Sequence, residues 1–104
     1  MLNLVPGHLY ELENFEDKNS AGQRLQFIHK EPDFDDPTTL KTVSDGTTTE
    51  EVLAVLIDRT EFLNKKFPCR DNALAITYLE NALLRLNKRT ADRVKRAVEG
   101  SAKA

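Results

Sequence analysis

The sequence lacks several features that mark familiar classes of protein. Its single cysteine, Cys69, excludes a disulfide within the chain and is typical of a reducing compartment. Together with only two histidines, it provides too few ligands for a structural zinc site of ordinary spacing. No apolar run approaches the roughly 20 residues of a membrane span, and the first residues do not form a secretory signal. We therefore expect a soluble protein without membrane attachment, bound metal or other cofactor.

Motifs of catalysis are also missing. The chain has no glycine-rich phosphate loop, no GxSxG and no HExxH sequence. Covalent catalysis needs a base beside the nucleophile, and no such pairing is visible. The adjacent carboxylates Asp35 and Asp36 lie in a predicted loop without recognisable catalytic context. The sequence therefore predicts a protein that is not an enzyme.

Charge is present in quantity but is unevenly distributed. Residues 1–51 hold 11 acids and 4 bases, a net of −7, whereas residues 52–104 hold 6 acids and 11 bases, a net of +5. The total is only −2, with an isoelectric point near 5.7. A general nucleic-acid binder would be basic overall, so no duplex nucleic acid is expected as partner. A small anionic ligand in a local basic site fits this division better.

The hydrophobic pattern predicts an α+β fold in a single domain, residues 1–104. Residues 1–45 read as strands and loops, and residues 46–100 as a helical hairpin. Apolar and polar residues alternate over 8–13 and 23–30, which predicts two antiparallel strands joined across residues 14–22. After an acidic loop over 31–37, a short strand is predicted at 40–43. The expected architecture is a small N-terminal antiparallel sheet followed by two helices.

Two helices are predicted from their boundary residues. Thr48 and Glu51 have capping-box spacing, and Pro68 ends the first helix. The second is expected to run from about residues 69–71 to about Val98, with Gly100 as its stop. About 29 residues give roughly 43 Å, more than the roughly 33 Å diameter of a compact chain this long. We therefore predict an obligate homo-oligomer; a shorter helix, broken near residues 87–90, is the alternative.

Basic residues recur along one face near the end of the second predicted helix. Arginines at spacings of four, four and three are Arg85, Arg89, Arg93 and Arg96, widened by Lys88 and Lys95. Guanidinium groups bind phosphate through paired donors in a planar fork. This stripe is therefore a candidate phosphate site. The alternative is a solvated face whose cations complement the helix dipole.

Aromatic and amide residues flank the predicted turn between the helices. Phe62, Phe67 and Asn72 lie there. An aromatic ring can stack on a nucleobase, and an asparagine amide can pair with an adenine edge. The alternative is that both phenylalanines are core residues and that Asn72 is an ordinary polar residue of a helix N-terminus.

Longer segments of the helical half resemble a known family. They are TEEVL at 49–53, RDNALAITYLENAL at 70–83, NKRTADR at 87–93 and VEG at 98–100. Over about residues 46–100 the chain resembles the phage Thoeris anti-defense family, which shares a helical hairpin with the anti-CBASS cyclic-nucleotide sponges. A sponge binds a ligand and holds it without converting it.

The resemblance implies a function in the cytoplasm of the infected bacterium. Such proteins sequester glycocyclic ADP-ribose isomers made by bacterial TIR-domain enzymes, and some also bind cyclic di- or trinucleotides, as hexamers. Phe62, Asn72 and Arg89 look like the family's aromatic, amide and arginine pocket positions, and Arg93 looks like the next cation on that face. Arg85 and, by its charge alone, Arg24 are further candidate phosphate ligands.

The main hypothesis is therefore a phage anti-defense sponge, assembled as a dimer or hexamer, that binds a cyclic ADP-ribose isomer or a cyclic oligonucleotide. One alternative is a structural or regulatory phage protein whose basic helix contacts nucleic acid. Another is an enzyme that cleaves nucleotides.

Overall fold

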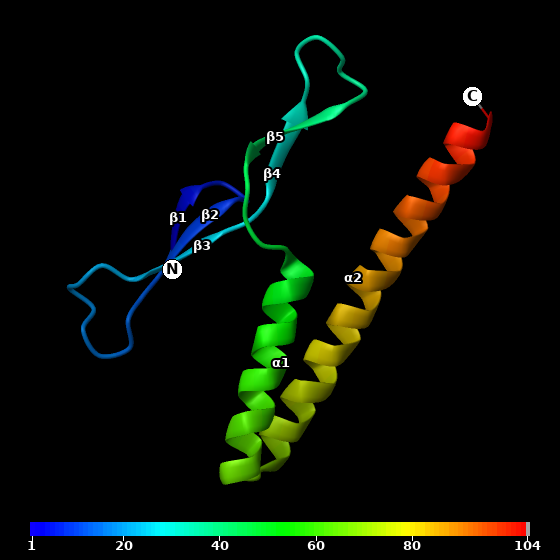
Figure 1. Cartoon of the computed structure of the whole chain (residues 1–104). Helices are drawn as coiled ribbons and strands as arrows, with labels where there is room; N and C mark the ends of the chain where they lie inside the picture. Colours follow the sequence, from blue (N-terminus) through cyan, green and yellow to red (C-terminus); the bar gives the residue numbers. More distant parts are fainter. Residues whose placement is uncertain (104) are drawn as a thin grey trace. The chain divides into compact units, whose positions relative to one another are not determined.

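The protein has an α+β fold with its strands first and its helices last (Figure 1). The computed structural model describes the backbone of residues 1–103 and the side chains of residues 1–97. The chain divides into two compact units, Met1–Thr49 with the strands and a second unit from Glu50 onward with the helices. The order of antiparallel strands and then two helices confirms the predicted fold class.

The first sheet has three antiparallel strands, β1 (Leu2–Val5), β2 (Leu9–Leu12) and β3 (Gln23–Gln26), in that order. The register Leu9↔Gln26 to Leu12↔Gln23 confirms the predicted hairpin across residues 14–22. Strand β1 was not predicted. Pro6 and Gly7 join it to β2 through a turn in which the His8 amide donates to the Val5 carbonyl over 2.9 Å. Gly7 has φ +79°, which glycine adopts without the steric cost of a side chain.

The predicted continuous strand over residues 23–30 is wrong. Strand β3 ends at Gln26, and β4 (His29–Pro32) pairs instead with β5 (Leu40–Ser44) in a second sheet. Between them, the amide of Phe27 donates to the His8 carbonyl and that of Ile28 to the Thr47 carbonyl, at 2.7 and 2.9 Å. The first bond continues the β2–β3 register by one residue pair, whereas the second turns Ile28 away from the first sheet, toward Thr47. Strand β5 confirms the short strand predicted at 40–43.

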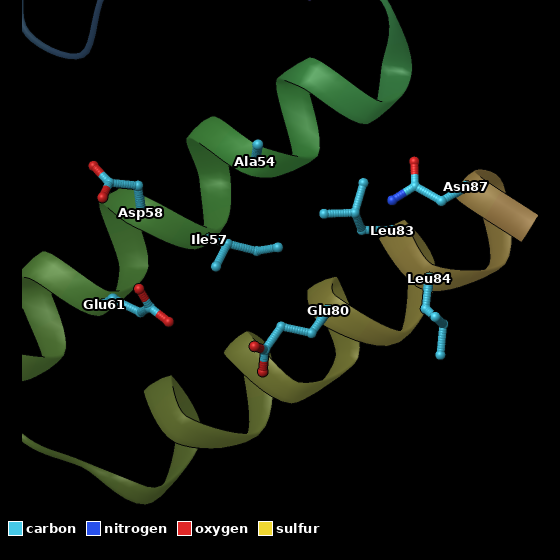
Figure 2. A pocket seen from close by; sticks show the side chains of 8 residues that line it. All are labelled: Ala54, Ile57, Asp58, Glu61, Glu80, Leu83, Leu84 and Asn87. Carbon is cyan, nitrogen blue, oxygen red and sulfur yellow. The ribbon is translucent and has the colours of Figure 1, made fainter.

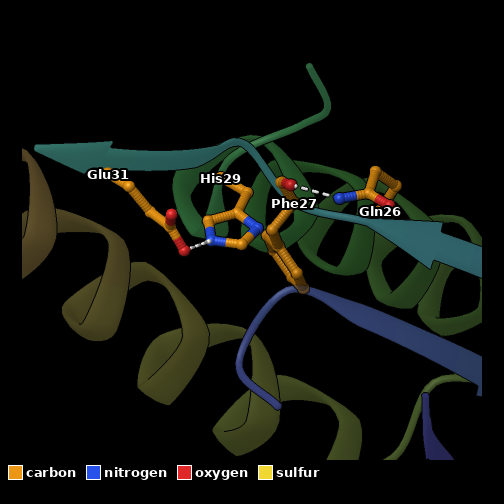
Figure 3. A network of polar contacts seen from close by, with 4 residues as sticks. All are labelled: Gln26, Phe27, His29 and Glu31. Carbon is orange, nitrogen blue, oxygen red and sulfur yellow. Dashed lines mark hydrogen bonds and ion pairs between the residues drawn. The ribbon is translucent and has the colours of Figure 1, made fainter. Parts of the chain in front are cut away.

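Ring contacts stabilise the place where the chain passes from β3 to β4. The imidazoles of His8 and His29 stack with centroids 3.7 Å apart, and Tyr10 meets Phe27 edge to face at 5.9 Å. Figure 3 shows the polar contacts beside them. The His29 Nε2 lies 3.0 Å from the Glu31 Oε1, and the Gln26 side-chain amide donates to the Phe27 carbonyl over 2.7 Å. The two histidines therefore help to join the first sheet to the second.

The loop between β4 and β5 is organised by Asp36. Its carboxylate accepts hydrogen bonds from the Thr38 hydroxyl at 2.6 Å, the Thr38 amide at 3.1 Å and the Thr39 hydroxyl at 2.8 Å. These bonds favour the charged form and hold the pKa of Asp36 below its ordinary value of 3.8.

We expect this loop to lose its hydrogen bonds in acid. Because the pKa of Asp36 is lowered by folding, its contribution to stability is fully present above pH 3.8 and is lost as the pH falls through the lowered pKa. An NMR titration of the Asp36 carboxyl carbon and the Thr38 amide should show both moving together below pH 3.8, and the amide transition should vanish in Asp36→Asn. An Asp36 transition at or above its ordinary pKa would contradict this.

The two helices begin where the sequence predicts. Helix α1 (Thr49–Lys66) starts directly after Thr48, and Pro68 follows its end. Acidic Glu50 and Glu51 lie in its first turn and basic Lys65 and Lys66 in its last, as the helix dipole favours.

Helix α2 (Arg70–Lys103) is continuous over 34 residues, which excludes the predicted alternative of a break near residues 87–90. The predicted stop at Gly100 is wrong, because α2 continues through it. A glycine weakens a helix by only about 1 kcal/mol relative to alanine, and the following Ala102 and Lys103 are strong helix formers.

Among the side chains that the structure describes, none is buried. Large apolar side chains on both helices remain accessible, including Leu56, Tyr78 and Leu84, and so does Phe67 between the helices. Phe62 and Phe67 are 51% and 77% exposed, so neither is a core residue of the single chain. Ile57 and Leu83, which line the space between α1 and α2, are only half-buried. The isolated chain thus leaves much of its apolar surface in water.

Candidate functional site

The strongest concentration of unpaired charge is the arginine face of α2, defined as Arg85, Arg89 and Arg93. All three are exposed and follow one another at intervals of four residues, or about 6 Å along the helix axis. In the part of the chain whose side chains are described, no carboxylate forms an ion pair with any of them. Their guanidinium donors are therefore available to an anion.

Phe62 lies on α1 with a cation against its ring. The Lys66 ammonium nitrogen stands 4.7 Å from the ring centroid, one turn further along the helix. Such a cation–π contact places a positive charge next to an accessible aromatic surface. A planar base stacked on Phe62 would thus have an ammonium group within reach of its phosphates. Sequence reasoning missed Lys66, although the Phe62–Lys66 spacing of four residues was the signal for it.

Asn72 belongs to the first turn of α2. Its backbone amide donates to the Cys69 Sγ over 3.3 Å, and the Cys69 amide donates to the Asn64 Oδ1 over 3.1 Å. Cys69 therefore caps α2. The half-buried carboxamide of Asn72 makes no hydrogen bond to other described residues, which leaves it able to bind a base or a ribose.

One chain does not bring all these groups together. Asn72 and Arg89 are 17 residues apart on one continuous helix, which corresponds to about 26 Å along its axis. Arg24 belongs to the strand unit, on β3, where its Nε lies 3.9 Å from the Glu11 Oε1. The structure thus groups the three arginines on one face and Phe62 with Lys66, and separates Asn72 from the arginines.

A groove of about 510 Å³ lies between α1 and α2 (Figure 2). It is lined by Ala54, Ile57, Asp58, Glu61, Glu80, Leu83, Leu84 and Asn87. None of the predicted site residues is among them. Its three ionisable side chains are carboxylates, which repel phosphate, so this interhelical groove is not the phosphate site. The recurrence of its lining residues at intervals of three and four on each helix was the sequence signal for it.

The comparison with known proteins assigns the hairpin to a family. The model of the Acb2/Tad1 hairpin domain matches residues 23–91, about two thirds of the chain. The chain belongs to the Acb2/Tad1 hairpin-domain family. Over 59 residues it is also 51% identical to Thoeris anti-defense 1 of Bacillus phage SBSphiJ7. This alignment covers 56% of the chain and 42% of that relative, so the chain spans less than half of the relative's length.

Most of the candidate residues of this Acb2/Tad1 hairpin protein fall inside the family match. Arg24, Phe62, Asn72, Arg85 and Arg89 lie within residues 23–91, and Arg93 lies just beyond it. The match also includes strands β3, β4 and β5, so it reaches further into the first half than the resemblance over residues 46–100 suggests.

Two further properties of this hairpin protein concern its described residues. No group of three or more His, Cys, Asp or Glu side chains within them is arranged to hold a metal ion. None of the helices in that part of the chain is long and apolar enough to cross a membrane.

Proposed function

We propose that this protein is a phage anti-defense sponge that sequesters a nucleotide signal of bacterial immunity in the host cytoplasm. The observation that carries the proposal is the 51% identity over 59 residues to Thoeris anti-defense 1. Glycocyclic ADP-ribose isomers are the first candidate ligands, and cyclic di- and trinucleotides are the second. The protein holds the ligand without cleaving it.

The accessible side chains suit the parts of such a ligand. Phe62 stacks on the adenine, and the free carboxamide of Asn72 hydrogen-bonds the base or ribose. Arg89 and Arg93 bind the diphosphate, with Arg85 as a further cation on the same face and Arg24 as a candidate from the strand unit. Stacking and charge-assisted hydrogen bonds supply affinity without an acid or base for catalysis.

The spacing of these groups favours a pocket shared between chains. Because Asn72 and Arg89 lie about 26 Å apart on one helix, they reach one small ligand only if they come from different chains. We therefore include a homo-oligomer, a dimer or hexamer, in the proposal. The accessible apolar surface of the isolated chain supports it.

A depletion experiment tests the sponge. The purified protein is incubated with a glycocyclic ADP-ribose isomer, passed through a size filter and then denatured by heat, and both fractions are chromatographed. We expect the ligand to leave the filtrate and to return intact after denaturation. Recovery of a degraded product would favour an enzyme.

The basic face of α2 also favours a second function, that of a regulatory or structural module that contacts nucleic acid. That module would leave the nucleotide in the filtrate and would retain duplex DNA in a salt-dependent manner. The same protein preparation can be assayed for both, so the two functions are distinguished directly.

A further inference from the structure

Phe62 and Lys66 form a pair on the outer side of α1. Lys66 follows Phe62 by four residues, about 40° around the helix, and its ammonium nitrogen lies 4.7 Å from the ring centroid. Both side chains are exposed. Lys66 also follows Ile57, which lines the interhelical groove, by nine residues, a net rotation of about 180° around the helix. The Phe62–Lys66 pair is therefore turned away from α2 and stays open in the single chain.

The arginine face of α2 points the other way. Arg89 follows Glu80 by nine residues, again a net rotation of about 180°, and Glu80 lines the groove. Figure 2 shows Ile57 and Glu80 directed into the space between the two helices. Phe62 and Arg89 of one chain thus face in opposite directions. A base stacked on Phe62 gains no phosphate contact from the arginine face of the same chain.

The charge of Lys66 is not engaged by an acid. In the part of the chain whose side chains are described, no carboxylate lies within ion-pair distance of its ammonium group. Glu61, the carboxylate nearest to Lys66 on α1, lines the groove instead. The ammonium rests against the Phe62 ring and keeps its hydrogen-bond donors for an anion.

We infer that the Phe62–Lys66 pair is a half-site for a purine nucleoside monophosphate that is complete within one chain. Phe62 takes the base on the ring face that Lys66 leaves open, and Lys66 binds the phosphate attached to that nucleoside. The inference rests on the proposed function, from which the stacking role of Phe62 comes. It makes Lys66 a specificity-determining residue, which selects phosphorylated over unphosphorylated nucleosides.

The chemistry of the two side chains divides the recognition between them. Stacking on an aromatic ring accepts any base and does not sense a phosphate, so the phosphate needs a cation of its own. The lysine ammonium sits on a flexible four-carbon stem, which lets it move from the face of the ring to its edge, where the ribose of a stacked nucleoside carries the phosphate. In a cyclic ADP-ribose isomer, Lys66 holds the phosphate next to the adenosine, and the arginines of another copy complete the diphosphate site.

AMP and adenosine test the half-site in the full-length protein. We expect Lys66→Met to lower the affinity for AMP about fivefold or more and to change that for adenosine far less, because methionine keeps much of the apolar stem but lacks the charge. Lys66→Arg should retain the preference for AMP. Ligand-observed NMR titration measures these weak affinities. A weaker dependence of AMP binding on salt in Lys66→Met is the second readout.

The matched control is Lys65→Met, the same loss of charge on the adjacent residue, which makes no cation–π contact in the described part of the chain. It should keep the preference of the protein for AMP. Equal losses of AMP and adenosine affinity in Lys66→Met would indicate a purely structural role and overturn the inference. So would an unchanged AMP affinity in that variant, or an unmodified protein that does not prefer AMP to adenosine.

Arg89→Ala separates the half-site from the rest of the pocket. It should lower the affinity for glycocyclic ADP-ribose by a far larger factor than the affinity for AMP, and equal losses would place the AMP phosphate on the arginine face instead. Depletion of glycocyclic ADP-ribose by the unmodified protein is measured in parallel. No depletion, together with AMP binding that depends on Lys66, would refute only the sponge. Depletion without that dependence would refute only the half-site.

Discussion

Arg89→Ala is expected to abolish the retention of glycocyclic ADP-ribose in the depletion assay, with an affinity loss of about 30-fold or more. Removal of one partner from a desolvated charge pair costs about 2–5 kcal/mol, because the phosphate then stays without its counter-charge. Arg89 has no competing ion pair in the described part of the chain, so its whole bonding capacity is available to the ligand. Isothermal titration calorimetry with the full-length protein gives the affinity directly.

Phe62→Ala provides an independent check on the same site. Loss of a stacked base is worth about 1–3 kcal/mol, and this change also removes the ring that the Lys66 ammonium contacts. Arg59→Ala, an exposed arginine on α1 outside the proposed site, is the control and should bind normally. Normal ligand depletion by both Arg89→Ala and Phe62→Ala would show that the pocket is elsewhere.

The second large effect concerns stability. We expect the midpoint of thermal unfolding to rise with protein concentration over a hundredfold range, by several degrees. A chain in which no described side chain is buried has too little apolar burial to offset the conformational entropy of folding. If its apolar surfaces are covered by other copies, folding and assembly are linked, and dilution destabilises the native state.

Differential scanning calorimetry at several protein concentrations measures the unfolding midpoint. Sedimentation velocity at the same concentrations gives the size of the assembly. A midpoint that does not change with concentration, together with the sedimentation of a single chain, would contradict the homo-oligomer. Saturating ligand should raise the midpoint further if the pocket lies between chains.

Boundary residues made the helices predictable. The ends of α1 are set by Thr48, by Pro68 and by the charged residues of its first and last turns. Each of these acts on backbone groups within one turn of the helix, so its effect can be read from neighbouring residues. Gly100 failed as a stop because a glycine only weakens a helix and does not forbid it. The turn at Pro6 and Gly7 was a usable signal for β1 that the alternation of residues 8–13 obscured.

The sequence by itself determined the fold class, the start of both helices and the arginine face, since periodicity and capping are properties of neighbouring residues. Only the tertiary structure decided that residues 23–30 form two strands, because the bond that turns the chain away from the first sheet joins Ile28 to Thr47, far away in the chain. It alone also showed an acidic groove between the helices and about 26 Å between Asn72 and Arg89. Those features depend on how one helix lies against the other and on the unbroken length of α2.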